Sequence, residues 1–280
     1  MADRQPDLVM IAGPNGSGKS TLVAALRAAP EIDFPALYIN ADDIQKTEGL
    51  GARTAQGEAQ RRRALAVASG ASVAFETVMS HPSHLALLQQ AREQGHRVIA
   101  HLVSLDAPER NVERVALRVQ EGGHDVPEEN TRARFPKTVA AFPSAISLAH
   151  ETYVYDNSSS AQPLRLEAVL VDNRLILKTP DAQPWVKALA KKVNQRAEEL
   201  EAMLEPLRQR GFSVSAAVLR DGASHGPLKV FEHHVLQSDP QQKHATLHDK
   251  ALLPPINERE ATILYNQGVA SISPVQQRER

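Results

Sequence analysis

The stretch from Leu8 to Leu22 restricts the fold of this chain more than any other part of the sequence. Residues 13–20 read GxxxxGKS, a pattern whose backbone N–H groups wrap the phosphates of a nucleotide. Residues 8–12 form an apolar run with the length of a buried parallel strand, and residues 21–26 have the composition of a helix start. A strand, a phosphate-binding loop and a helix in this order predict an α/β fold built around a nucleotide site.

The loop predicts the nucleotide-binding residues and the cofactors. Lys19 supplies a positive charge for the β- and γ-phosphates, and Ser20 offers a hydroxyl to Mg²⁺, so we expect a nucleoside triphosphate together with Mg²⁺. The alternative is a glycine-rich turn with an incidental lysine. The residues predicted to bind nucleotide are Gly13, Pro14, Asn15, Gly16, Ser17, Gly18, Lys19, Ser20 and Thr21.

Composition excludes several other classes of protein. Among the 280 residues there is no cysteine, which excludes a disulfide scaffold and thiolate chemistry and fits a reducing compartment. The N-terminus lacks the apolar core of a signal peptide, and no apolar run approaches the roughly 20 residues that span a bilayer. We therefore expect a cytoplasmic protein that does not bind membranes. A net charge of −1 argues against broad binding to nucleic acid.

Strands alternate with helices over residues 8–178, which predicts an α/β fold with a mostly parallel sheet flanked by helices. Short strands at 36–40, 72–75, 96–103 and 152–155 follow the strand before the loop. Residues 164–178 predict two more strands around an Asp172-Asn173 turn.

Two carboxylates follow the second and third predicted strands. Asp42 and Glu76 come where these strands end, and the carboxyl ends of parallel strands share one edge of the sheet, where ligands bind. Either carboxylate could accept a proton from a substrate hydroxyl. The alternatives are that Asp42 caps a short helix and that Glu76 lies on the surface. In the helix between them, we expect the run 61–63 of three arginines to face solvent.

Basic side chains also gather on a predicted helix–turn–helix. The first helix covers residues 108–121, GGHDVP at 122–127 forms the turn, and the second helix begins at Pro127. Such a unit could close as a lid over phosphates. Its basic side chains are Arg114, Arg118, Arg132, Arg134 and Lys137.

The C-terminal third has a different pattern. After a loop at 179–184, a long amphipathic helix follows, which Pro206 should kink or split near its end, and short strands and turns come after Gly211. We predict a P-loop domain at 1–180, a bridging helix at 181–211 and a small β domain at 212–280. The histidines of this last part are expected to be solvated rather than metal-bound: His233, His234, His244 and His248.

Several segments occur in the order typical of one known family. They are GPNGSGKST at 13–21, INADD at 39–43, FET at 75–77, RVQEGGHDVPEENTRARFPKT at 118–138 and YDNS at 155–158. Over residues 8–178 the chain thus resembles the zeta toxin family of P-loop kinases. This resemblance implies phosphoryl transfer from ATP or GTP, with Mg²⁺, to a sugar hydroxyl of UDP-N-acetylglucosamine. It also implies a small antitoxin protein as a partner.

The resemblance implies roles for individual residues. Lys19 and Ser20 would hold nucleotide and metal, Asp42 would be the catalytic base, and Arg118 would clamp a phosphate. The catalytic residues predicted in this way are Asp42, Lys19 and Arg118. Substrate binding is predicted for Asp42, Glu76, Thr77 and Ser80, and the lid clamp for Arg118, Arg132 and Arg134.

Two points of the pattern stay open. The second lid contact could be Arg132, Arg134 or His124. In the segment FETVMS, some toxins have a glycine between the acid and the threonine and an arginine soon after, whereas Ser80 and His81 stand here.

These features predict a kinase of a nucleotide sugar that acts as a toxin of a toxin–antitoxin system. The alternatives are a kinase of a nucleic-acid end or an antibiotic hydroxyl, or a nucleotide-switched binding module that acts through its C-terminal domain. Segments of that domain are weakly similar to the small domain of plasmid-borne KfrB proteins, and nucleic acid stays open as its partner.

Overall fold

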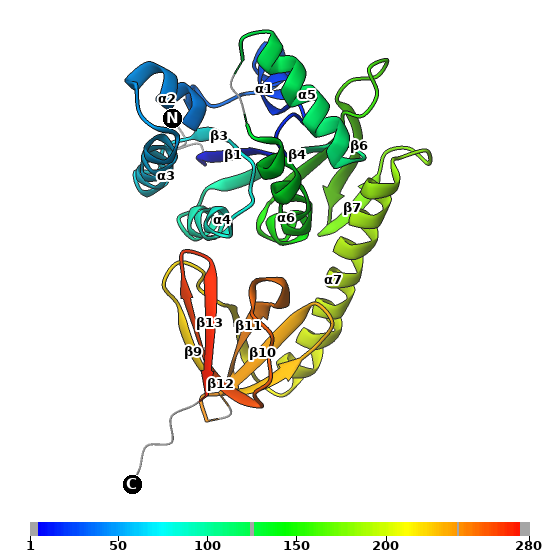
Figure 1. Cartoon of the computed structure of the whole chain (residues 1–280). Coiled ribbons are helices and arrows are strands. Elements are labelled where there is room, and N and C mark those ends of the chain that lie inside the picture. The colour runs from blue at the N-terminus through cyan, green and yellow to red at the C-terminus, as the bar shows by residue number, and fades with distance from the viewer. Residues whose placement is uncertain (1–4, 124–125, 240, 275–280) are drawn as a thin grey trace.

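A seven-stranded sheet organises the N-terminal part of the protein (Figure 1). The structure is a computed structural model that describes residues 5–123, 126–239 and 241–274. The strand order is β2-β3-β1-β4-β5-β6-β7, in which the first five strands are parallel, β6 pairs antiparallel with β5, and β7 pairs antiparallel with β6. The strands are β1 (Asp7–Ala12), β2 (Leu37–Ile39), β3 (Val73–Thr77), β4 (Arg97–Ser104), β5 (Glu151–Asp156), β6 (Arg165–Val171) and β7 (Arg174–Leu177). The expected α/β fold with a mostly parallel sheet is confirmed.

Helices cover both faces of this sheet. They are α1 (Lys19–Ala28), α2 (Ala41–Glu48), α3 (Ala52–Ala68), α4 (Ser83–Glu93), α5 (Pro108–Gln120), α6 (Glu128–Leu148) and α7 (Pro184–Gln209). Figure 1 shows α1 and α5 on one side of the sheet and α4 and α6 on the other. The continuous apolar run of β1 is explained by this arrangement, because a central parallel strand is buried on both faces.

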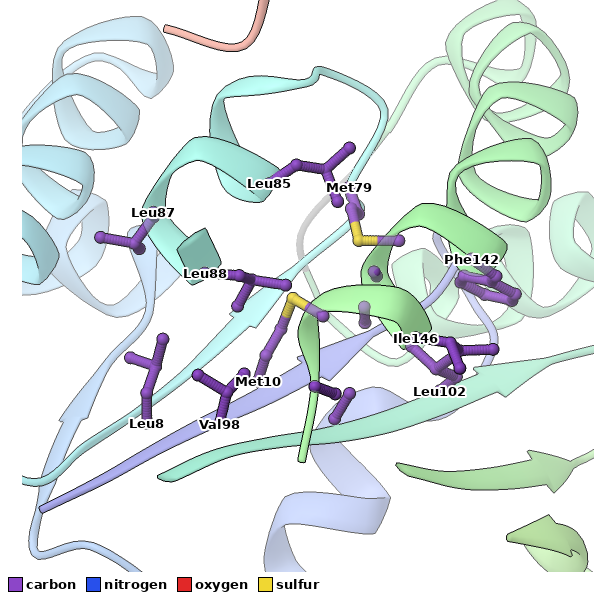
Figure 2. Packing of buried hydrophobic residues seen from close by; sticks show 14 of the residues in the cluster. Leu8, Met10, Met79, Leu85, Leu87, Leu88, Val98, Leu102, Phe142 and Ile146 are labelled. Atoms are coloured by element: carbon purple, nitrogen blue, oxygen red, sulfur yellow. The ribbon is translucent and has the colours of Figure 1, made fainter. Parts of the chain in front are cut away.

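Side chains of β1 alternate between two hydrophobic clusters. Val9 and Ile11 pack with Leu22 and Leu26 of α1 on one face. Met10 points to the other face, and Figure 2 shows it among the buried leucines of α4 and near α6. The period of two in a strand therefore puts alternate residues of one short segment into two separate cores.

The last two strands of the sheet form the predicted hairpin. Asp172 and Asn173 join β6 to β7 with φ angles of 49° and 61°. Positive φ at both central residues is the conformation of a type I′ turn, which Asn and Asp tolerate well. The predicted turn at these residues is confirmed.

A second, six-stranded sheet follows α7, with the order β13-β12-β9-β10-β11-β8. Its strands are β8 (Ser213–Ala216), β9 (Ala223–Val230), β10 (His234–Asp239), β11 (His244–Asp249), β12 (Glu260–Asn266) and β13 (Val269–Pro274). The short strands expected after Gly211 are present. Pro206 lies inside α7, which runs unbroken to Gln209, so the expected split does not occur.

The second sheet packs against α4 of the first part. The side chain of Gln89, which is 7% exposed, accepts a hydrogen bond from the Leu219 N–H at 2.7 Å and donates one to the Ala217 carbonyl at 2.7 Å. Ala217, Leu219 and Ile263 belong to the same hydrophobic cluster as Met10. The two sheets thus share a core, and the division at residues 180 and 211 stays a prediction.

Two histidines of the second sheet lie in its interior. His248 is fully buried, with Nδ1 3.1 Å from the hydroxyl of Tyr265, and His234 is 6% exposed, with Nδ1 2.8 Å from Glu199. The expectation that these two rings are solvated is wrong, because alternate residues of each strand face the core. Among residues 5–123, 126–239 and 241–274, no three His, Asp or Glu side chains are grouped as metal ligands.

None of the helices in the described part of the chain combines the length and the apolar character that crossing a membrane requires.

Candidate active site

The loop between β1 and α1 is held to the carboxyl edge of the sheet. The N–H of Gly13 donates to the Thr77 carbonyl of β3 at 3.2 Å. Gly18 has a φ of 98° and directly precedes the first turn of α1. The ammonium group of Lys19 donates to the carbonyls of Gly13 and Pro14 at 3.0 and 2.9 Å. The predicted loop therefore begins the helix whose N-terminus faces the carboxyl ends of the strands.

Two asparagines, which sequence patterns did not single out, hold the loop from outside. The Nδ2 of Asn111 in α5 donates to the Asn15 carbonyl at 2.6 Å, and the Nδ2 of Asn157 donates to the Ser17 carbonyl at 2.9 Å. A Cβ on Gly18 would lie 2.3 Å from the Asn157 Nδ2. The only sequence signal for Asn157 was its place in YDNS, just after a strand.

Glu76 lies directly beside the loop. Its carboxylate accepts a hydrogen bond from the Ser20 hydroxyl at 3.1 Å and another from the Tyr38 hydroxyl of β2. Glu76 is only 9% exposed, so the alternative that it is a surface carboxylate is wrong. Burial and the negative charge of Glu76 raise the pKa of Tyr38, which keeps this hydroxyl a hydrogen-bond donor.

Asp42 reaches the same edge from the start of α2. Asn40 caps this helix, because its Oδ1 accepts the Asp42 N–H at 2.9 Å. The alternative that Asp42 is the cap is therefore wrong, and its side chain is exposed. Asp42 and Glu76 both act electrostatically on Lys19.

Helices α5 and α6, which the sequence predicts to form a lid, contribute arginines to this region. Arg118, in the last turn of α5, acts electrostatically on Lys19. A Cβ on Gly123 would lie 2.5 Å from the Arg118 Cγ, so the glycine leaves room for this side chain. Arg114 instead donates to the Asn157 carbonyl at 2.7 Å. His124, one of the three candidates for the second clamp, lies outside the described residues.

The other two candidates, Arg132 and Arg134, point to different sides of α6. Arg132 pairs with Glu109 and with Glu128, both at 2.8 Å. Arg134 lies three residues after the buried Thr131 and four before Thr138, whose hydroxyl donates to the Val78 carbonyl at 2.7 Å.

Because residues three and four apart share a helix face, Arg134 lies on the face of α6 that meets the end of β3. Within residues 5–123, 126–239 and 241–274, the guanidinium of Arg134 forms no hydrogen bond or ion pair. Of these two arginines, Arg134 is therefore the one whose charge is available to a ligand.

Comparison with known proteins agrees with the fold of the first sheet. Residues 8–140 match the family described as AAA domain. The AvrRxo1-ORF1:AvrRxo1-ORF2 complex, solved with ATP, contains a chain of similar fold with a TM-score of 0.50. The chain has the fold of a P-loop kinase. The alignment is 16% identical and covers 68% of this chain but 63% of the other, less than two thirds of its length.

Two further proteins are similar to part of this chain. An uncharacterized protein of Haemophilus influenzae is 27% identical over 135 residues, which cover 47% of this chain and 94% of that protein. A structure from the PezAT toxin–antitoxin system of Streptococcus pneumoniae covers 73% of this chain and 90% of its own, with 14% identity and a TM-score of 0.45.

The donor set of this P-loop kinase fold suits Mg²⁺. The Ser20 hydroxyl and the Glu76 carboxylate are hard oxygen donors 3.1 Å apart. Mg²⁺ in kinase sites is bound through one or two such protein groups, with phosphate oxygens and water completing its octahedron. Ser20 and Glu76 are therefore the residues that could hold the ion.

The segment after β3 is shaped by Thr77 and Met79. The Thr77 hydroxyl accepts the Met79 N–H at 2.9 Å and lies 2.8 Å from Nε2 of His84. Met79 has a φ of 55°, a strained conformation that its fully packed side chain holds in place (Figure 2). Ser80 follows with a half-exposed side chain. Thr77 is thus close to Glu76 in a fixed geometry, whereas Ser80 lies in the connection to α4.

Arg63 lies inside the protein and not on its surface as expected. It is 5% exposed, stacks 4.7 Å above the Phe75 ring and donates to the Glu76 carbonyl at 3.2 Å. Only the first two arginines of the run face outward, where both pair with Glu58. Arg63 therefore supports β3 directly beneath the site.

Lys19 gives the P-loop a measurable dependence on pH. Burial lowers its pKa to about 8, with a further lowering from Arg118, while the carboxylates of Glu76 and Asp42 oppose the shift. Phosphates favour the charged lysine, so we expect ATP binding at pH 8 to take up about half a proton. Calorimetry in two buffers of different ionisation enthalpy measures this uptake. Lys19→Arg, which stays charged, should abolish it, and an uptake of zero in the wild type would contradict the assignment.

Proposed function

We propose that this protein is a kinase that transfers the γ-phosphoryl group of ATP or GTP to a hydroxyl of a nucleotide sugar. One observation carries this proposal: the ends of β2 and β3 deliver Asp42 and Glu76 to the edge of the sheet where the P-loop presents Lys19. A switch that binds nucleotide without transfer would not need an exposed carboxylate beside its P-loop lysine. The complex of a similar fold that was solved with ATP supports the choice of donor.

In the proposed reaction, the acceptor hydroxyl oxygen forms a bond to the γ-phosphorus while the bond to the bridging oxygen of the β-phosphate breaks. Asp42 takes the hydroxyl proton, and ADP or GDP leaves. Lys19 and Arg118 stabilise the charge on the phosphoryl oxygens. Ser20 and Glu76 would hold Mg²⁺, which would neutralise phosphate charge.

UDP-N-acetylglucosamine is the acceptor we propose, on the strength of the motifs at 75–77 and 118–138. Incubation with ATP, Mg²⁺ and this sugar nucleotide should give a phosphorylated sugar product, detected by ³¹P NMR and mass spectrometry. If another metabolite is phosphorylated instead, the acceptor is wrong but the reaction class stands. Phosphorylation of an oligonucleotide end would favour the alternative of a nucleic-acid kinase.

Arg134 is the second phosphate clamp in this proposal. Arg134→Ala should lower kcat by at least about tenfold, because one charge-assisted contact to the transferred group is lost. Arg132→Ala, on the same helix, is the matched control and should change kcat less than about threefold, since its charge is already paired with two carboxylates. The reverse order of effects would assign the clamp to Arg132.

We further propose that the activity is toxic in the cytoplasm and that a small antitoxin protein restrains it. Growth arrest on expression that depends on Asp42 would support this role. Growth effects that survive Asp42→Ala but require residues 212–280 would instead favour a binding module that acts through the C-terminal domain.

A further inference from the structure

A small pocket lies where the second sheet meets α3 and α4. Two of its lining residues come from the C-terminal part of the chain, although the pocket adjoins the end of β3. Its polar lining includes Gln60, Arg63, Ser83, His84, Arg220 and Gln267. Figure 1 shows the β12–β13 turn pointing toward α4. This turn is in close contact there, since a Cβ on Gly268 would lie 2.4 Å from the Pro82 carbonyl oxygen.

The pocket is positively charged. It has two guanidinium groups, from Arg63 and Arg220, and no Asp or Glu among its lining residues. Arg220 is 50% exposed and approaches Asp221 only at 3.5 Å. The Nε of Arg63 is buried and has no hydrogen-bond partner in the described part of the chain. The positive charges of these two guanidinium groups favour an anion in the pocket.

The size of the pocket limits what it can hold. Its volume is about 40 Å³, on a scale where one water needs about 10–15 Å³. A carboxylate or a phosphoryl group fits this space, whereas a nucleotide or a sugar ring does not. The pocket is therefore suited to one anionic group of a larger molecule, or to a free ion.

The pocket is connected to the proposed acceptor site through two side chains. Arg63 donates to the Glu76 carbonyl at 3.2 Å, and His84 lies 2.8 Å from the Thr77 hydroxyl. Burial, and then the charge of Arg63, lowers the pKa of His84 to about 4, so its ring is neutral at pH 7. The single N–H of this neutral ring, at Nδ1, lies 3.2 Å from the His81 carbonyl oxygen, so His84 reports on the pocket and does not itself bind the anion.

We propose that this pocket binds a carboxylate or phosphoryl group of the acceptor, and that Arg220, in the turn between β8 and β9, is a specificity-determining residue. This inference rests on the proposed kinase function, since it concerns the acceptor of that reaction. The second sheet then completes the substrate site. It would select acceptors that carry an anionic group at a fixed distance from the reacting hydroxyl.

Inorganic phosphate is the first probe. The full chain is saturated with a non-hydrolysable ATP analogue and Mg²⁺, which blocks the P-loop, and phosphate is titrated while NMR follows the His84 ring. Phosphate should shift the His84 signals, and Arg220→Gln should weaken its Kd about tenfold through loss of a charge-assisted contact. Arg210→Gln, an exposed arginine outside the pocket, is the matched control and should leave the Kd unchanged.

This titration requires no turnover, so its outcome is separate from that of the kinase proposal. No phosphate-dependent shift of His84, or equal Kd values in the Arg220→Gln and Arg210→Gln variants, would overturn the inference even if the protein proves to be a kinase.

The acceptor is the second probe and separates a bound group of the substrate from a free ion. With UDP-N-acetylglucosamine, Arg220→Gln should raise KM about tenfold while kcat changes little, and inorganic phosphate should compete with the acceptor. If phosphate and the acceptor bind together without competition, the pocket holds a free ion and its assignment to the acceptor is wrong.

Discussion

Asp42→Asn should lower phosphoryl transfer by about 10²–10⁴-fold while ATP still binds with a Kd within about threefold of the wild type. The amide cannot take the proton of the acceptor hydroxyl, and this range is what general-base catalysis contributes. ATP affinity should persist because the loop at 13–20 holds the nucleotide. The substitution is isosteric, at an exposed position in the first turn of α2, so the fold should be unaffected.

Asp43→Asn is the matched control for this variant. Asp43 is the neighbouring exposed carboxylate in the same helical turn, and it has no role in the proposed reaction. Its variant should transfer at the wild-type rate. The role of Asp42 as the base would be contradicted by Asp42→Asn retaining transfer within threefold, or by its losing ATP binding as well.

Gly13→Ala should destabilise the protein by about 3 kcal/mol and abolish ATP binding. A Cβ here would lie 2.1 Å from the Val103 carbonyl oxygen and 2.7 Å from the Ser17 Oγ, closer than any real contact. Because β4 holds this carbonyl in the sheet, the loop must move, at the cost typical of an overpacked core. Thermal and urea denaturation measure the change in stability, and calorimetry measures ATP binding.

Gly57→Ala is a control with the opposite expected sign. Gly57 lies inside α3, and a Cβ there would have no heavy atom within 4 Å. Alanine in place of a helical glycine should stabilise the protein by about 0.5–1 kcal/mol. If Gly13→Ala is tolerated as well as Gly57→Ala, the loop is not packed against β4 as described.

Much of the first sheet follows from local pattern. The run at 8–12 and the strand ends at 40–42 and 76–77 could be placed on one edge from the sequence, since parallel strands end on the same side. Which strands are neighbours could not be predicted in this way. The contacts of Glu76 with Ser20 and Tyr38 depend on β3 lying between β2 and β1.

The burial of Arg63 follows from the spacing of small residues in α3. Ala55, Ala59, Arg63 and Ala66 recur at spacings of four, four and three residues and form the buried face of α3. Arg63, the third arginine of the run, falls on the same helix face as these small residues and is therefore buried. A residue of a charge run is expected to face solvent only where its helical position falls outside the face formed by the small apolar residues.

The C-terminal sheet was the least predictable part. Its strands are short, several are exposed on both faces, and β8 pairs in parallel with the distant β11. Such pairings depend on long-range contacts that local periodicity does not encode. The link between Gln89 and the segment at 217–219 joins residues about 130 positions apart in the chain.

The central claim is that this protein transfers a phosphoryl group from a nucleoside triphosphate to a small-molecule hydroxyl. Metabolite profiling of cells that express the wild type or Asp42→Asn tests it most directly, because it presumes no acceptor. We predict a new phosphomonoester in wild-type cells only. Identical profiles, with the purified wild type and the variant releasing inorganic phosphate from ATP at the same rate, would contradict the claim.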